Sequence, residues 1–171
     1  MIPEWYKNNF HDIESALVDL FQKVFPSIKC VSWIPDDWFE KGGDTDPLLR
    51  FMRIPPGYVH WETRREECSV QVAAAIPPDY DAYVPNRDRA WQVINVVRAC
   101  LLPMDGFPIA YETSDGDREV FIHGVEESVG PQVLPELGVP DARVVPVTFK
   151  ICSDVHMVDI DYDYLSILRD L

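Results

Sequence analysis

The most regular array of potential metal ligands is an alternating run of acids near the C-terminus. Asp159, Asp161 and Asp163 match positions 1, 3 and 5 of a calcium-binding loop. Such a loop needs glycine at its sixth position and a bidentate glutamate at its twelfth, where this chain has Tyr164 and Asp170. An alternating acidic strand or tail explains the run better than calcium binding. We therefore expect no metal and no other cofactor.

A second group of acids lies in a glycine-bounded stretch. Asp36, Asp37, Glu40 and Lys41 are the residue types found in metal-dependent nucleases. In such enzymes the later acid and the lysine lie on a strand well beyond the first aspartate, whereas all four residues here crowd into one loop. We interpret the group as a solvated loop. A small metal-dependent hydrolase that uses Asp36, Asp37 or the run at 159–163 is one alternative function.

The residues needed for nucleophilic catalysis form no known pattern either. The chain contains no Gly-x-Ser-x-Gly sequence and no glycine loop that would cradle a phosphate. The four histidines, His11, His60, His123 and His156, lack the spacing of metal ligands, and no local order suggests a Cys–His–Asp set. The sequence therefore predicts no catalytic residue, and we expect the chain not to be an enzyme.

Composition indicates a folded protein. A chain of 171 residues with 47% hydrophobic residues can form one domain with a real core. No apolar run approaches the roughly 20 residues that span a bilayer, and the N-terminus does not resemble a signal peptide. We expect a cytoplasmic protein with no membrane partner. Its cysteines lie in apolar stretches and are predicted to be buried free thiols: Cys30, Cys68, Cys100 and Cys152.

The net charge of −14 is unevenly distributed. Residues 1–102 hold 15 acids and 11 bases, whereas residues 103–171 hold 14 acids and 4 bases. A surface of this kind repels phosphate backbones and anionic lipids. The charge therefore argues against sequence-specific binding of nucleic acid. A further alternative function is an adaptor of the host regulatory or immunity type that binds a basic partner through its acidic C-terminal half.

Two segments have the spacing of amphipathic helices. In residues 13–25 the apolar residues recur at i, i+3, i+4 and i+7, with Asp12 as the expected cap and Pro26 as the stop. Residues 87–102 form the second helix, and Asn86 is its expected cap. The apolar stripe of that helix consists of Ala90, Val93, Ile94, Val97 and Leu101.

Six segments are predicted to be strands, because they alternate in hydrophobicity and are bounded by turn residues. They are residues 28–33, 48–54, 66–76, 107–111, 120–126 and 143–152. Pro55, Pro56 and Gly57 are expected to end the second strand. Residues 114–117 are expected to form a hairpin turn, and residues 128–141 a loop.

The order of these elements predicts an α+β fold. We expect a mixed or antiparallel sheet of about five to six strands with two helices packed on it. The small residues Ala73 and Ala75 on one face of the third strand suggest that something packs closely there. Residues 1–153 are expected to form a single domain, and residues 154–171 a separate acidic C-terminal segment.

Several large aromatic side chains lie on predicted loops. Residues 55–62 carry Tyr58 and Trp61, and such side chains either cover the core as a lid or await a partner. The sequence leaves these two interpretations open, and the same holds for the tyrosines of the loop at 77–85. The candidate assembly residues are Tyr58, His60, Trp61, Tyr80, Tyr83, Asp159, Asp161 and Asp163.

The order of elements and the residues at their junctions resemble the tail terminator proteins, also called tail completion or minor tail proteins, of long-tailed phages with actinobacterial hosts. The resemblance covers about residues 12–153. It rests on an opening helix followed by a strand that ends in Trp33, and on a second helix with the sequence VVRACLL at 96–102. A variable loop rich in glycine and proline and a closing strand that begins at Arg143 complete the pattern.

The resemblance implies a structural protein of the virion. Such proteins form a hexameric ring at the head-proximal end of the tail, after assembly in the host cytoplasm. The implied partners are further copies of the chain, the tail tube protein and the head–tail connector protein, while phage DNA passes through without specific binding. Another head–tail joining or neck protein, or a tail tube protein, is the alternative of the same kind.

Overall fold

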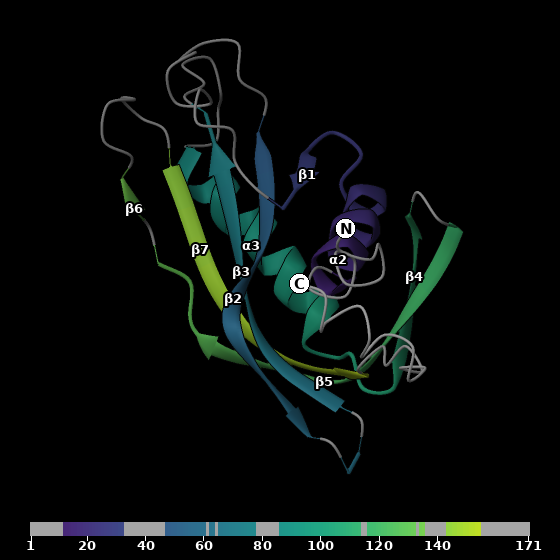
Figure 1. The fold of residues 1–171 in the computed structure, drawn as a ribbon. Coiled ribbons are helices and arrows are strands. Elements are labelled where there is room, and N and C mark those ends of the chain that lie inside the picture. Colours follow the sequence, from purple (N-terminus) through teal and green to yellow (C-terminus); the bar gives the residue numbers. More distant parts are fainter. Residues whose placement is uncertain are drawn as a thin grey trace, which may run out of the picture.

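The computed structural model describes residues 12–32, 47–60, 62–63, 65–77, 86–113, 116–132, 134–135 and 143–154. In these residues two helices, α2 (Asp12–Val24) and α3 (Asn86–Leu101), pack on a curled sheet of seven strands (Figure 1). The strands are β1 (Lys29–Val31), β2 (Leu48–His60), β3 (Arg65–Ile76), β4 (Phe107–Thr113), β5 (Gly116–Val129), β6 (Leu134–Pro135) and β7 (Arg143–Asp154). The predicted α+β class is confirmed, and the sheet is somewhat larger than predicted.

The sheet is mixed, because one strand pair is parallel. Its order is β1-β2-β3-β7-β5-β4, with β6 added beside β7. β1 runs parallel to β2, and all other pairs are antiparallel. The longest uninterrupted ladder joins β3 to β7, from Arg65 opposite Asp154 to Ile76 opposite Arg143. These two central strands therefore form the frame on which α3 packs and beside which the outer strands pair.

Both helices lie against the same face of the sheet and share one core. The alternation predicted for β3 is confirmed, since the side chains of Cys68, Val70, Val72 and Ala74 are buried in this core. The apolar faces of the two helices pack against it, and the ring of Phe21 on α2 stacks on Phe51 of β2 at 5.0 Å between centroids. Burial of these faces provides the main driving force for the fold.

The opposite face of β3 is also covered where it carries alanines. Ala73 and Ala75 have no exposed surface. Ala73 lies between Arg50 and Pro146 on the two neighbouring strands, and Ala75 lies between Leu48 and Val144. The small side chains let these larger cross-strand neighbours close over them.

β2 does not end where its prolines predicted. The strand continues through Pro55, Pro56 and Gly57 to His60, so residues 58–60 belong to a strand rather than to a loop. The register shifts between Ile54 and Tyr58, where β2 holds more residues than the facing part of β3. A bulge of this kind leaves the extra residues out of the ladder. Proline, which has no backbone N–H to donate, is therefore tolerated there.

The predicted loop at 128–141 is also partly wrong. β5 extends to Val129, and Leu134 and Pro135 form the short strand β6 opposite Val144 and Arg143 of β7. Pro135 is compatible with this place because β6 is a short strand at the margin of the sheet.

Three polar side chains of α2 accept hydrogen bonds from the backbone of three different strands. Glu14 Oε1 accepts from the N–H of Arg53 on β2, Asp19 Oδ2 from Glu112 on β4, and Gln22 Oε1 from Cys30 on β1. The last two bonds are each 3.0 Å long. α2 therefore lies between the two margins of the curled sheet and satisfies N–H groups on both (Figure 1).

Candidate assembly surface

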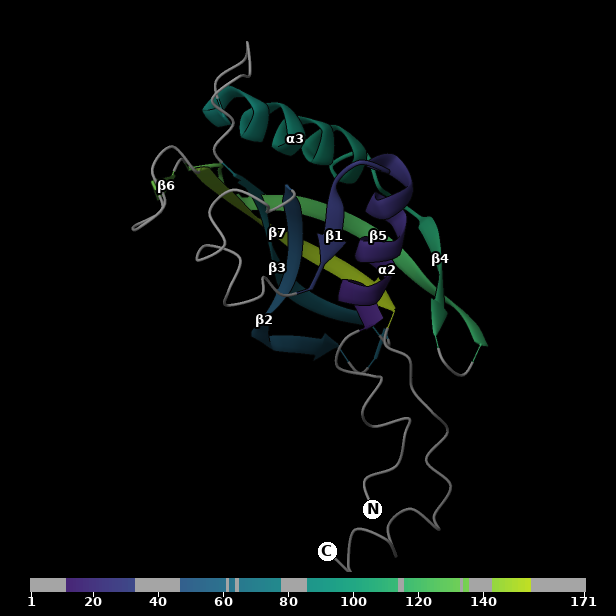
Figure 2. The same cartoon turned by 90° about the horizontal axis from the view of Figure 1, so that it is seen from above.

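The ends of β2 and β3 extend past the helices at one end of the sheet, where β7 still pairs with the other side of β3 (Figure 1). We call residues 58–60 and 65–67 the arm. In the arm Tyr58 pairs with Glu67, Val59 with Glu66, and His60 with Arg65. The arm is part of the sheet itself, and Figure 2 shows the end of β2 well apart from α3.

The arm exposes apolar surface. The side chain of Tyr58 is 67% exposed and that of Val59 is 37% exposed. The sequence left open whether these residues cover the core or await a partner, and this exposure excludes a core lid for Tyr58. His60 is exposed as well. Their position on paired strands gives these side chains a rigid frame.

The base of the arm holds an ion pair against a glycine. Arg53 pairs with Glu66 across the bulge, and both side chains are largely shielded from solvent. A Cβ on Gly57 would lie 2.6 Å from Glu66 Oε1 and 2.8 Å from Arg53 Nη2. The ends of these two side chains therefore occupy the space above Gly57, and a larger residue at this position would require them to shift.

A second ion pair lies on the other face of the arm. Lys150 Nζ on β7 contacts Glu67 Oε1 at 2.8 Å. The hydrogen bond and the charge of Glu67 raise the pKa of Lys150 above its usual value. The two glutamates of the arm thus each have a cationic partner, and the exposed apolar residues stand beside neutralised acids.

The nearest approach to a catalytic arrangement is a histidine–carboxylate pair. His123 Nε2 on β5 lies 2.5 Å from Asp154 Oδ1 at the end of β7, and its ring contacts that of Phe121. A carboxylate can orient an imidazole, but a nucleophilic mechanism also needs a hydroxyl or thiol bonded to the other side of the ring. In the part of the chain that the structure describes, no serine or cysteine hydrogen-bonds to His123.

No three His, Cys, Asp or Glu side chains come together in the described ranges in a way that would hold a metal ion. No described helix is long and apolar enough to cross a membrane. The four cysteines are free, and burial raises the pKa of the Cys30 thiol to about 12.

Of the candidate assembly residues, Tyr58 and His60 come together on the arm. The others lie outside the described residues: Trp61, Tyr80, Tyr83, Asp159, Asp161 and Asp163. Asp36 and Asp37, on which the hydrolase alternative depends, lie outside them too.

Sequence reasoning missed the outward side of α3, which is exposed and carries no charge. The signal was present, because Arg98 is the only charged residue from Ala90 to Met104.

The described residues thus combine an α+β sheet with exposed apolar side chains at the end of β2. The family model of the phage tail termination protein matches residues 9–155, and the chain belongs to this family. It therefore has a structural role in the tail of a phage virion, as the resemblance implied. Among curated protein sequences, none matches the chain.

Proposed function

We propose that this chain forms a hexameric ring on the head-proximal end of the tail tube. The ring ends tube polymerisation and presents a surface to the head–tail connector protein. The observation that carries the proposal is the exposed arm in a member of the tail termination family. A cyclic ring needs two different surface patches on each subunit, and a rigid projection with apolar side chains suits one of them.

The charge of the chain supports a position around the DNA channel. A net charge of −14 on each copy repels DNA phosphates, so DNA passes through the ring without being held. The acidic residues Asp159, Asp161 and Asp163 are proposed to face water or the channel from the C-terminal segment. The family match ends at residue 155 and β7 ends at Asp154, which supports a boundary between domain and segment at this point.

The mass of the purified chain, alone and mixed with tail tube protein, tests the ring. We expect a monomer or weak oligomer at low concentration, and six copies on the tube. A tube subunit would instead polymerise without limit. A two-fold dimer as the sole stable form would contradict the proposal.

Phage assembly tests the arm. Changing Tyr58 and Trp61 to serine should leave the subunit folded, while tails lose their length control or fail to join heads. Val129→Ser is the control, because Val129 is also an exposed strand residue, 49% exposed, but lies away from the arm. Normal tails in the double variant would remove the arm from the proposed interface.

A further inference from the structure

The outward side of α3 is an exposed surface without charge. Its exposed side chains follow one stripe along the helix and into the turn after it. We call this stripe the α3 face, and it consists of Gln92, Asn95, Val96, Ala99, Leu102 and Pro103. Val96 is 40% exposed and Leu102 is 41% exposed. In a chain with 26% charged residues, a solvent-facing stripe of this length normally carries several charges.

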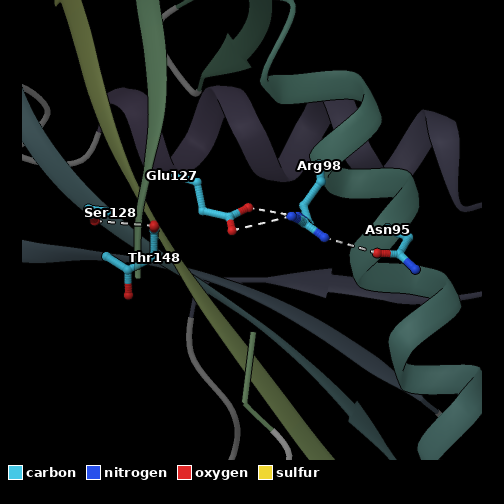
Figure 3. A network of polar contacts seen from close by, with 5 residues as sticks. All are labelled: Asn95, Arg98, Glu127, Ser128 and Thr148. Carbon is cyan, nitrogen blue, oxygen red and sulfur yellow. Dashed lines mark hydrogen bonds and ion pairs between the residues drawn. The ribbon is translucent and has the colours of Figure 1, made fainter. Parts of the chain in front are cut away.

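Between Ala90 and Met104 the only charged side chain is Arg98, and it is neutralised from the sheet. Arg98 Nε donates to Glu127 Oε2 at 2.6 Å, and Arg98 Nη2 donates to Glu127 Oε1 at 3.3 Å (Figure 3). Its third nitrogen, Nη1, donates to Asn95 Oδ1 at 3.3 Å. The guanidinium is thus held by a residue of β5 and turned toward it. The α3 face therefore presents no unpaired charge.

The inner side of α3 is apolar. Ala90, Ile94, Val97 and Leu101 on that side are fully buried against the sheet. The outer side differs from an ordinary solvent-facing helix side in carrying amides and aliphatic side chains in place of charges. The other helix differs, since α2 exposes Lys23 and uses Glu14, Asp19 and Gln22 to bind the sheet margins. An uncharged patch is also the composition of the centre of a protein interface.

We propose that the α3 face of one copy receives the arm of the next copy in the ring, an inference that rests on the ring proposed above. A second copy is favoured because both patches are free of unpaired acids. Two chains that each have a net charge of −14 can approach closely only where their acids are absent or neutralised. On the arm, Glu66 and Glu67 meet this condition through Arg53 and Lys150.

The placement of the two patches suits a head-to-tail contact. The arm is the end of two strands of the sheet, and α3 lies against the sheet apart from the arm (Figure 2), so the two patches are separate surfaces of one copy. Each subunit then offers one patch to the copy before it and the other patch to the copy after it. This is the heterologous arrangement that closes a ring when the rotation per subunit is right.

Single charges placed in each patch test the contact. Val96→Asp alters the α3 face and Val59→Asp alters the arm, each at an exposed position. Val24→Asp is the matched control, because Val24 on the other helix is 40% exposed, as is Val96. At a concentration where the wild-type chain forms its ring, alone or on tube protein, we expect the control to form the ring. Each of the other two variants should sediment as a monomer.

Mixing the two defective variants identifies the contact. The Val96→Asp chain keeps an intact arm, and the Val59→Asp chain keeps an intact α3 face. An equal mixture should therefore give a dimer with one chain of each kind, and no ring. Circular dichroism confirms folding; if Val96→Asp does not fold, Leu102→Asp takes its place.

The outcomes separate the two proposals. If Val96→Asp still forms the wild-type ring, or if the mixture stays monomeric while the wild type forms rings, the α3 contact is wrong and the ring proposal stands. A wild-type chain that forms no ring on tube protein overturns both.

Discussion

Glu14 on α2 accepts a hydrogen bond from the backbone N–H of Arg53 on β2, a residue 39 positions further along the chain. The Glu14 side chain is buried, and the bond satisfies an N–H that points away from β3. Unpaired N–H groups at a sheet margin invite pairing with another chain. α2 thus joins the core and at the same time blocks part of a sheet margin.

Removal of this acceptor should destabilise the fold. Glu14→Ala leaves a shielded N–H without its partner, and we expect a loss of about 1–3 kcal/mol in the free energy of unfolding. Glu14→Gln keeps an acceptor oxygen and should lose less. Asp19→Ala, which removes the more exposed bond to Glu112, should cost under about 1 kcal/mol. Urea unfolding measures all three, and equal losses would contradict this ranking.

A methyl group on Gly57 should displace the ion pair of Arg53 and Glu66. In Gly57→Ala the new Cβ meets the ends of these two flexible side chains, which can shift, so the variant should lose no more than the contribution of the pair, about 1 kcal/mol. Gly124→Ala is the control, because a Cβ on Gly124 would meet nothing within 4 Å. The control should change stability by less than about 1 kcal/mol. If both variants unfold at the same urea concentration, the ion pair moves aside at little cost.

The pair of Arg98 and Glu127 should show a measurable coupling. The side chains are 35% and 20% exposed, so the pair lies between a surface and a buried salt bridge. A double-mutant cycle with Arg98→Gln and Glu127→Gln should give a coupling of about 1 kcal/mol at low salt, and less at high salt. A coupling of zero at low salt would show that the two geometric contacts contribute no stability.

Stability should fall in alkaline solution because of Cys30. Burial raises the pKa of this thiol from 9.0 to about 12. Above pH 9 the unfolded chain loses this proton while the folded chain keeps it, so the free energy of unfolding decreases until about pH 12. The contribution is up to about 1.4 kcal/mol for each pH unit. Urea unfolding of the wild type and Cys30→Ala at several pH values should show a shallower decline in the variant. Parallel curves would contradict this assignment.

Much of the local structure was determined by the sequence. The apolar spacing around Leu17 and Phe21 predicted α2, and the alternation of Cys68, Val70 and Val72 predicted the buried face of β3. These patterns are reliable because the period of a helix or strand decides which side chains share a face. The order of the elements was enough to predict the α+β class and to point to the tail terminators.

The candidate site was predicted only in part, because its features depend on residues far apart in the chain. The prolines at 55 and 56 indicated a break, yet pairing with β3 carries β2 on to His60 and places Tyr58 on a strand. Periodicity shows that a side of α3 is buried, but the tertiary structure decides that its other side stays uncovered in the subunit. Likewise, only the folding of β5 back toward α3 brings Glu127 to Arg98, 29 residues away, and removes the charge from that surface. Such long-range pairings follow from packing of the whole chain, which no local pattern encodes.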